Sequence, residues 1–312
     1  MRVREKNHNE FAMQIGHRLL NAQAETNSLR AGLGLPRRRT VSKALVYLLL
    51  LVGGLLLMVP FFWMLSTSFK SVDEVQTWPI TWIPRQFLWR NYSQVFEKTP
   101  FARYILNSMV IASGGIIGTV ISSALAGYGF ARLRFPGRDK LFFLNLTTLM
   151  LPAWVVIVPH FMMFSAIHWL DTYLPIVVPA FFGNAFYIFL FRQAFLGIPR
   201  ELEDAARMDG CSTLRIFLQI FLPLSKPVIA TVSIFSFYYY WNDLIYPLVY
   251  LQSQQKFPVS LGLRMFQSSN WGLVNFPLMM AASLMALLPC VALFFFAQRL
   301  FIQGVVVTGV EK

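Results

Sequence analysis

Long apolar runs, separated by short polar segments, dominate the sequence. A helix needs about 20 apolar residues to cross roughly 30 Å of hydrocarbon at about 1.5 Å per residue. Six runs reach this length, at residues 44–65, 104–130, 141–164, 173–195, 224–251 and 277–301. The pattern therefore predicts an all-α polytopic membrane protein with six transmembrane helices.

The composition also indicates that most of this chain lies in a lipid bilayer. Of 312 residues, 56% are hydrophobic and 13% are charged, which is more apolar surface than a soluble domain of this size can bury. About forty residues precede the first run. This is too long for the leading part of a cleaved signal peptide, so we interpret the run as a permanent span.

Lys and Arg are distributed unevenly between the two sides of the predicted membrane. The N-terminus, the second and fourth loops and the C-terminus carry 20 of the 27, with Arg192 counted in the fourth loop, against 7 on the other side. The side richer in Lys and Arg is normally cytoplasmic, so both termini are predicted to be cytoplasmic. Topology thus accounts for the formal charge of +13, and a nucleic-acid partner is not expected.

Motifs of enzyme chemistry are missing from the sequence. It contains no Gly-Lys dipeptide, no His-Glu-x-x-His and no Gly-x-Ser-x-Gly, which excludes the phosphate-binding loop and the common hydrolase signatures. Cys211 and Cys290 are too few for a disulfide scaffold and have no metal-like spacing with the four histidines. We therefore predict no catalytic residue, no metal site and no cofactor on this chain.

Two polar segments each allow two interpretations. Apolar residues at helical spacing within residues 1–40, near a basic run, fit an amphipathic surface helix or a disordered tail with a positive anchor. Residues 253–276, opposite the cytoplasm, are long enough either to contact a soluble partner or to serve as a connector.

Small residues and prolines mark places where the spans should pack closely or bend. Gly114, Gly118, Ser122 and Ala126 recur at every fourth position, which predicts a face for close helix approach, unless they reflect only the usual composition of membrane helices. Prolines in or near spans predict kinks or hinges. They are Pro60, Pro152, Pro159, Pro175, Pro179, Pro247 and Pro289.

Asp243 is the one acid placed well inside a predicted span. A carboxylate there is costly unless it is paired or faces water. One interpretation is a wet translocation path, with aromatic faces for sugar rings and polar groups for hydroxyls; the other is an Asn–Asp pair that caps or cross-links helices. The path candidates are Tyr238, Tyr239, Tyr240, Trp241, Asn242 and Asp243, with Asn184 and Tyr187 on the fourth span.

The fourth loop, residues 197–223, has the signals of two short helices. Pro199 suits a first helical turn, the acids that follow complement its positive end, and Gly210 supplies a stop about three turns later. Ser212 is a suitable cap for the second helix, and Pro223 marks a bend back into the bilayer. Two adjacent alanines on the first helix leave its backbone accessible to a groove of another protein.

This loop resembles the cytoplasmic EAA loop of permease subunits in binding-protein-dependent ABC importers. Its pattern is Glu-Ala-Ala, three residues, Gly, nine residues, Ile, one residue and Leu-Pro, and every spacing is kept here, with Asp204 replacing the first Glu. The resemblance implies a coupling helix that docks in a cleft of a cytoplasmic ATPase and moves when ATP closes the ATPase dimer. The implied coupling residues are Glu203, Asp204, Ala205, Ala206, Asp209, Gly210, Ile220, Leu222 and Pro223.

Further segments, among them "YGFARLRFPGRDKLFF" and "YYYWNDLIYPL", are similar to the carbohydrate branch of these importers, the maltose and glycerol-phosphate type. The resemblance covers nearly the whole chain beyond residue 40 and implies the ABC type I importer permease fold. The chain would then consist of a cytoplasmic extension (1–43), which is longer than the family pattern and takes no role from it, a six-helix transmembrane domain (44–302) and a cytoplasmic tail (303–312).

The same resemblance implies an assembly in the bacterial or archaeal cytoplasmic membrane. Its partners would be a second homologous permease, two ATPase subunits that bind ATP and Mg²⁺, an extracytoplasmic solute-binding protein, membrane lipid and the sugar substrate. This chain would be a non-catalytic subunit forming half of the path for a sugar, polyol or sugar phosphate. The alternative is a self-sufficient secondary transporter or channel, which predicts buried ion-coupling acids or bases in several spans.

Overall fold

The structure of the protein, a computed structural model, describes residues 38–266 and 275–307. Every regular element within these ranges is a helix. By backbone contacts the chain divides into two compact units, residues 1–62 and 63–312, and each is considered by itself. Most of the predicted N-terminal extension and the end of the predicted C-terminal tail lie outside the described residues. The predicted domain boundaries therefore stay predictions.

Helix α2 (Arg38–Ser68) supplies the described part of the first unit. From Leu45 to Phe62 its side chains are exposed on every face of the helix, and nearly all of them are apolar. A helix that is apolar all round suits a lipid environment.

The second unit contains the other helices, in an order that alternates long spans with short connecting helices. They are α3 (Val72–Gln76), α4 (Arg90–Lys98), α5 (Phe101–Arg132), α6 (Arg138–Thr147), η1 (Thr148–Met150), α7 (Ala153–Ala166), α8 (Leu174–Val177), η2 (Val178–Phe182), α9 (Ala185–Leu196), α10 (Arg200–Met208), α11 (Thr213–Ile216), η3 (Phe217–Phe221), α12 (Leu222–Leu224), α13 (Lys226–Asn242), α14 (Ile245–Tyr250), η4 (Gln254–Lys256), α15 (Val259–Leu263), η5 (Arg264–Phe266) and α16 (Phe276–Val307).

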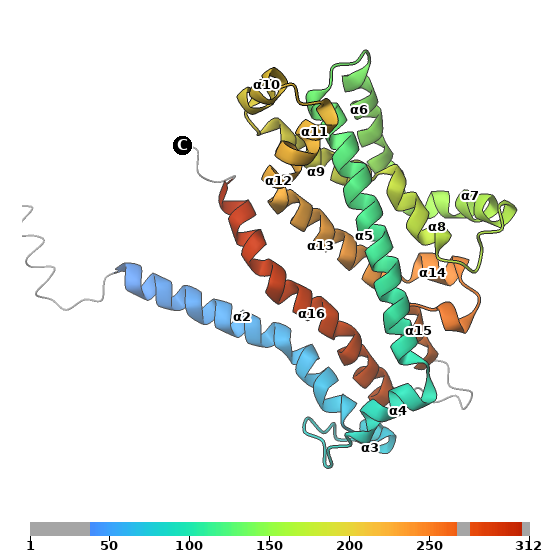
Figure 1. The fold of residues 1–312 in the computed structure, drawn as a ribbon. Helices are drawn as coiled ribbons and strands as arrows, with labels where there is room; N and C mark the ends of the chain where they lie inside the picture. Colours follow the sequence, from blue (N-terminus) through green and yellow to red (C-terminus); the bar gives the residue numbers. More distant parts are fainter. Residues whose placement is uncertain (1–37, 267–274, 308–312) are drawn as a thin grey trace, which may run out of the picture. The chain divides into compact units, whose positions relative to one another are not determined.

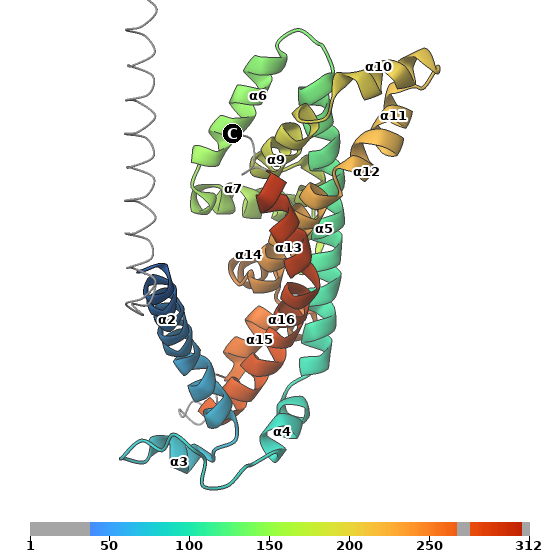
Figure 2. The same ribbon diagram turned by 90° about the vertical axis from the view of Figure 1, so that its left-hand side faces the viewer.

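Helix α5 is the central helix of this unit. It contacts α9, α13 and η2 along its length, and Figure 1 and Figure 2 show α10 and α11 beyond one end of it and α4 at the other. We name the end at Arg132 the inner end and the end at Phe101 the outer end, following the predicted orientation, which itself stays a prediction.

The predicted face of small residues on α5 is confirmed at three positions. A side chain on Gly114 or Gly118 would come under 3.0 Å from side chains of α8 or η2. Ser122 Oγ donates to the carbonyl oxygen of Ala180 at 2.8 Å. The small residues therefore let α5 approach the segment after α7 closely, as in other membrane helix pairs.

The described helices accommodate the predicted multi-pass topology. Four of them are long and apolar enough to cross a membrane singly: Leu45–Ser68, Phe101–Arg132, Leu174–Leu196 and Phe276–Gln298. Two further pairs pass the same criteria only together and are bent, Arg138–Met150 with Trp154–Ala166 by 101°, and Thr213–Leu224 with Lys226–Asn242 by 78°. The described chain thus has four spans, or six when each bent pair counts as one.

The fifth predicted span, residues 224–251, does not form one helix. α13 ends at Asn242, and α14 begins three residues later. Asp243 Oδ1 accepts the backbone N–H groups of Ile245 and Tyr246 at 3.1 and 3.3 Å. This local hydrogen bonding competes with continuation of the helix, which the apolar pattern alone does not reveal.

Two apolar clusters hold the two ends of α5 in place. The inner cluster consists of Ala124, Tyr128, Ala131, Phe191, Phe195, Ala206, Ile216, Phe217, Phe221 and Val232. The outer cluster consists of Val95, Phe101, Tyr104, Val259, Phe266, Leu278, Ala281, Ala282 and Ala286. The space between them contains the cavity described below.

Candidate functional site

The loop at the inner end folds into the two short helices that its sequence predicts. α10 follows Pro199 and ends before Gly210, whose φ of +78° is left-handed. Glycine adopts this conformation without a Cβ clash, so it ends the helix cheaply. Ser212 Oγ then caps α11 by accepting the N–H of Arg215 at 3.4 Å. The chain turns at Ser225, slightly later than the predicted bend at Pro223.

The coupling residues implied by the sequence divide between two faces of α10. Glu203 and Ala206 are buried, with 7% and 8% of their surface exposed. The exposed members are Asp204, Ala205, Asp209 and Gly210. One face of α10 is therefore held by its own chain, and the other is presented outward.

Sequence reasoning missed the apolar residues of the outward surface. Met208 is 88% exposed, and Leu202 on α10 and Leu214 on α11 are 44% and 60% exposed. Each of these residues alone is an ordinary surface residue, and an exposed apolar patch indicates an interface only when its members lie together, which the sequence does not show.

The carboxylate of Glu203 is an acceptor for two arginines. Oε1 lies 2.8 Å from Arg207 Nη2 on the same helix, and Oε2 lies 3.8 Å from Nη1 of Arg132 at the inner end of α5. The hydrogen bond to Glu203 raises the pKa of Arg207. Sequence reasoning assigned Glu203 to the coupling surface, whereas it lies inside, and it gave Arg132 no role.

The end of the motif packs against the bundle. Ile220 and Leu222 are partly buried against the inner cluster, and Pro223 is exposed. Since η3 is a π-helix, this segment departs from regular α geometry where it enters the unit. These residues hold the loop in place and are not part of the outward face of α10.

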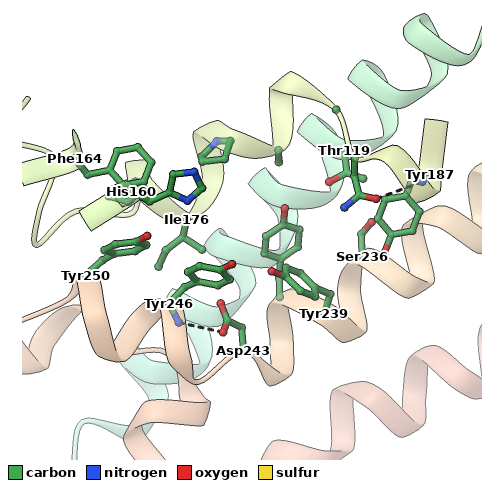
Figure 3. A pocket seen from close by; sticks show the side chains of 16 residues that line it. Thr119, His160, Phe164, Ile176, Tyr187, Ser236, Tyr239, Asp243, Tyr246 and Tyr250 are labelled. Carbon is green, nitrogen blue, oxygen red and sulfur yellow. Dashed lines mark hydrogen bonds between the residues drawn. The ribbon is translucent and has the colours of Figure 1, made fainter. Parts of the chain in front are cut away.

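A cavity of about 250 Å³ lies in the middle of the unit, among α5, α7, α8, η2, α9, α13 and α14 (Figure 3). Its wall is rich in tyrosine and hydroxyl groups. The polar lining residues are Thr119, His160, Asn184, Tyr187, Ser236, Tyr239, Tyr240, Asp243, Tyr246 and Tyr250. Aromatic faces beside hydroxyl and amide groups can hold a hydroxylated ring.

Asp243 caps a helix, as one of the two interpretations predicts, although Asn242 takes no part in the cap. Its role in a solute path stays a prediction. Its Oδ1 caps α14, as described above, while its Oδ2 is buried at the cavity and has no hydrogen-bond partner in the described part of the chain. The carboxylate therefore shapes the backbone with one oxygen and faces the cavity with the other (Figure 3).

Four further path candidates line the same cavity. They are Asn184, Tyr187, Tyr239 and Tyr240. Asn184 Oδ1 accepts the N–H groups of Phe186 and Tyr187 at 3.0 and 3.4 Å, so it caps α9 while lying at the cavity wall.

Three path candidates lie elsewhere. Trp241 is only 3% exposed, and its Nε1 donates to the carbonyl oxygen of Ala286 at 3.1 Å. It joins α13 to α16 and is not among the residues that line the cavity. Asn242 donates to the carbonyl oxygen of Tyr238 at 2.9 Å and lines a second, adjoining hollow of about 700 Å³. Tyr238 is 67% exposed and lines the same hollow.

The structure adds cavity residues that sequence reasoning did not single out. They are Thr119, His160, Ser236, Tyr246 and Tyr250. The criterion applied to Asp243, a polar group within an apolar span, would have found the first three. Across residues 38–266 and 275–307, no group of three His, Cys, Asp or Glu side chains is placed to hold a metal ion.

Comparison with known proteins gives a family and several relatives. The family model "Binding-protein-dependent transport system inner membrane component" matches residues 118–307. The sn-glycerol-3-phosphate transport system permease protein UgpE of Yersinia enterocolitica is 33% identical over 268 residues, covering 83% of this chain and 94% of that protein. The arabinooligosaccharides transport system permease protein AraQ of Bacillus subtilis is 32% identical over 275 residues, covering 87% and 97%.

Two solved structures share the fold. A chain of a bacterial ABC transporter involved in import of the acidic polysaccharide alginate has a TM-score of 0.76 at 23% identity, covering 85% of this chain and 98% of that chain. A chain of the alginate transporter in complex with a pentasaccharide-bound periplasmic protein has a TM-score of 0.59 at 13% identity. The helical fold of an ABC importer permease is therefore shared.

Proposed function

This chain belongs to the binding-protein-dependent transport system inner membrane components, and we propose that it imports a neutral, hydroxylated solute such as a sugar or polyol. It is a multi-pass, non-catalytic permease subunit, and the ATPase is a separate chain. Family membership also removes the alternative of a self-sufficient secondary transporter or channel.

The two-faced character of α10 is the observation that carries the coupling role. Its outward face presents Asp204, Ala205 and Met208, while Glu203 and Ala206 attach it to the bundle. A short helix held on one side and exposed on the other can dock on a partner and pass a displacement inward. The proposed partner at this face is an ATPase subunit that binds ATP and Mg²⁺.

The remaining assembly follows the family. A second homologous permease supplies the other half of the path, a second ATPase subunit completes the motor, and an extracytoplasmic solute-binding protein delivers the solute. The site of action is the bacterial or archaeal cytoplasmic membrane. A solved chain of similar fold belongs to a transporter in complex with a pentasaccharide-bound periplasmic protein, which supports the proposed binding-protein partner.

The cavity favours an uncharged solute over an anion. Its described lining contains one carboxylate, Asp243, together with tyrosine, serine, threonine, asparagine and one histidine, His160, and neither Lys nor Arg. Recognition of a phosphate or a uronic acid normally uses Arg, Lys or the free N–H groups of a helix N-terminus. The N-terminus of α9 lies at the cavity wall, but Asn184 Oδ1 already accepts two of its N–H groups. Of the relatives named above, the arabinooligosaccharide system is therefore the better guide to solute chemistry than the glycerol-phosphate or alginate systems.

The proposal is tested in proteoliposomes that contain the full complex with its binding protein. A neutral oligosaccharide is expected to stimulate ATP turnover and to be taken up, whereas glycerol 3-phosphate at the same concentration is not. Asp204→Lys, alone or with Asp209→Lys, should lower uptake about a hundredfold, because misplaced charge at a docked surface costs several kcal/mol.

The matched control is Asp139→Lys. This residue lies on α6 at the same end of the unit, its side chain is 75% exposed, and it pairs only across the surface with Arg138. Its charge reversal should leave uptake unchanged. Asp243→Asn should lower uptake less than the change at Asp204. Uptake without any ATPase subunit, or normal turnover with Asp204→Lys, would contradict the coupling role.

A further inference from the structure

Arg132, the last residue of α5, has a side chain that is only 4% exposed. A guanidinium keeps its proton in proteins, so burying it is costly unless hydrogen bonds and an opposite charge compensate. The partners of this buried cation therefore identify what the inner end of α5 holds together.

The first partners are carbonyl groups at the end of α9. Arg132 Nε donates to Phe195 O at 3.1 Å, and Nη2 donates to Phe195 O and Ile198 O. The last carbonyls of a helix lack partners within the helix and lie at its negative end, where a cation is stabilising. Arg132 thereby fixes the end of α9 and the turn that leads into α10.

The other partners are α10 and η3. Arg132 Nη1 lies 3.8 Å from Glu203 Oε2, and the guanidinium carbon lies 4.8 Å from the centre of the Phe221 ring. One side chain on α5 therefore contacts three other elements. The planar, five-donor fork of arginine suits this task, whereas the single ammonium of lysine does not.

α10 has few other attachments. Its buried residues are Glu203 and Ala206, and Ala206 contributes one methyl group to the inner cluster. Glu203 is therefore the long side chain that attaches α10 to the bundle, and Arg132 receives it on α5. Arg207, also bound to Glu203, lies on α10 itself.

α5 in turn reaches the cavity. Thr119, which lines it, is 13 positions before Arg132, about 20 Å along the helix axis. Near it, a Cβ added to Gly115 would come under 3.0 Å from the ring of Tyr240 on α13. Because α5 packs this closely against α13, a displacement of α5 must also displace the cavity wall.

We infer that Arg132 is a positioning residue of the coupling step. It fastens α10, α9 and η3 to the inner end of α5, so that movement of α10 by the ATPase is passed to the cavity wall. It contacts neither nucleotide nor solute. This inference rests on the proposed function and specifies how its mechanical step is transmitted.

The first test compares two identical substitutions in the reconstituted complex. Arg132→Gln should lower the number of solute molecules taken up per ATP about tenfold, with basal ATP turnover retained. Arg138→Gln is the control, because Arg138 lies at the same end of the unit but its partners are near neighbours in sequence, the carboxylate of Asp139 and the carbonyl oxygen of Leu133, and it should behave as the unmodified complex. Arg132→Lys, which keeps the charge and loses the fork, should fall between them.

The second test measures transmission directly. Spin labels are placed at Arg200→Cys, the exposed first residue of α10, and at Ile117→Cys, which is 53% exposed on α5, after replacement of Cys211 and Cys290 by alanine. With Arg132 present, the distance between the labels should stay constant between the ATP-bound and nucleotide-free complex. With Arg132→Gln it should change, since α10 then moves without α5.

If Arg132→Gln prevents assembly of the complex, Glu203→Gln replaces it in both tests, because glutamine keeps the side-chain shape of glutamate and removes its charge. A normal ratio of solute to ATP, with a constant label distance, in both variants overturns the inference. A distance that already changes with nucleotide in the unmodified complex overturns it too. Failure of the proposed function is distinguishable, since the unmodified complex would then show no solute-stimulated ATP turnover.

Discussion

The two ends of α5 are attached to their surroundings by different chemistry. At the inner end, the charged side chain of Arg132 contacts α9, α10 and η3. At the outer end, uncharged side chains bind the backbone of the segment after α14. Asn107 Nδ2 donates to the carbonyl oxygens of Gln255 and Phe257, both at 2.9 Å, and Ser108 Oγ accepts the N–H of Val259 at 2.8 Å.

Asp171 strengthens the outer attachment from the loop between α7 and α8. Its carboxylate accepts the N–H groups of Gln252 and Ser253, the hydroxyl of Ser253 and the ammonium of Lys256, at 2.5 to 3.0 Å. Its own N–H donates to Tyr250 O at 2.8 Å. One residue thus joins this loop to residues 250–256.

The difference shows how each end of α5 can respond to a partner. The outer end is bound at many backbone positions and includes the outer cluster, so it must move as one body with residues 250–259. At the inner end, α10 is joined to α5 by a charged contact and by Ala206 of the inner cluster, and its other face is exposed. A partner that binds this exposed face can therefore displace α10 together with α5, which is what a transmission element requires.

The largest expected effect is at the outer end. Asn107→Asp keeps the side-chain shape but directs an acceptor at two carbonyl oxygens, so the free energy of unfolding should fall by about 3 kcal/mol. The measurement is thermal unfolding of the detergent-purified complex. Gln255→Glu makes the same amide-to-acid change at an exposed side chain and should leave the midpoint unchanged. Equal midpoints for both variants would mean that Asn107 does not fasten the outer end.

A smaller loss is expected for Asp171→Asn, about 2 kcal/mol, because a charge-assisted contact becomes a neutral one. Burial of Asp171 acts to raise its pKa, but hydrogen bonds from Ser253, Lys256 and Gln252 outweigh this and hold the pKa well below its usual value of 3.8. The charged form is thus the stabilising one.

The sign of this pH dependence is testable. The contribution of Asp171 should be complete above its ordinary pKa and should be lost as the pH falls toward the lowered folded-state pKa. The stability difference between the unmodified protein and Asp171→Asn should therefore be constant from about pH 5 to 8 and shrink below about pH 4. The exposed Asp73, replaced by Asn, provides the control. A difference that grows on acidification would contradict the assignment.

The smallest effect is expected at the inner end, from Gly210→Val. A β-branched residue at a φ of +78° is strained by about 1–2 kcal/mol, which should displace the end of α10 and lower uptake about tenfold. Gly210→Asn tolerates the left-handed conformation and should retain most of the uptake. Similar uptake by the two variants would mean that the turn geometry does not position α10.

Much of the fold was accessible from periodicity and spacing. Apolar runs predict spans because crossing a bilayer requires a fixed helix length, and Gly114, Gly118 and Ser122 mark the close-packed face of α5 because only small residues permit it. The turn at Gly210 and the cap at Ser212 were equally local properties. The break after Asn242 was missed, because apolar composition continues through a position where a single side chain interrupts the helix.

For the two candidate sites as well, some features were accessible from the sequence and others were not. The spacing from Asp204 to Pro223 marked the loop that we propose as the coupling loop, and an acid within a span pointed to the cavity. Spacing could not show that Glu203 faces inward to Arg132, 71 positions earlier, or that Trp241 bonds to α16 while its neighbours face the cavity. Such contacts join residues far apart in sequence, and their direction depends on how the helices are rotated against each other.

The sequence by itself determined the class of the molecule, the apolar runs that can form its spans, and the position of the surface loop that we propose couples it to a partner, because these depend on local composition and on distances along the chain. Only the tertiary structure decided which face of each helix is buried, which side chains share one cavity, and that Arg132 gathers three elements at one end of α5. These depend on packing between helices, which local hydrophobicity constrains but does not specify.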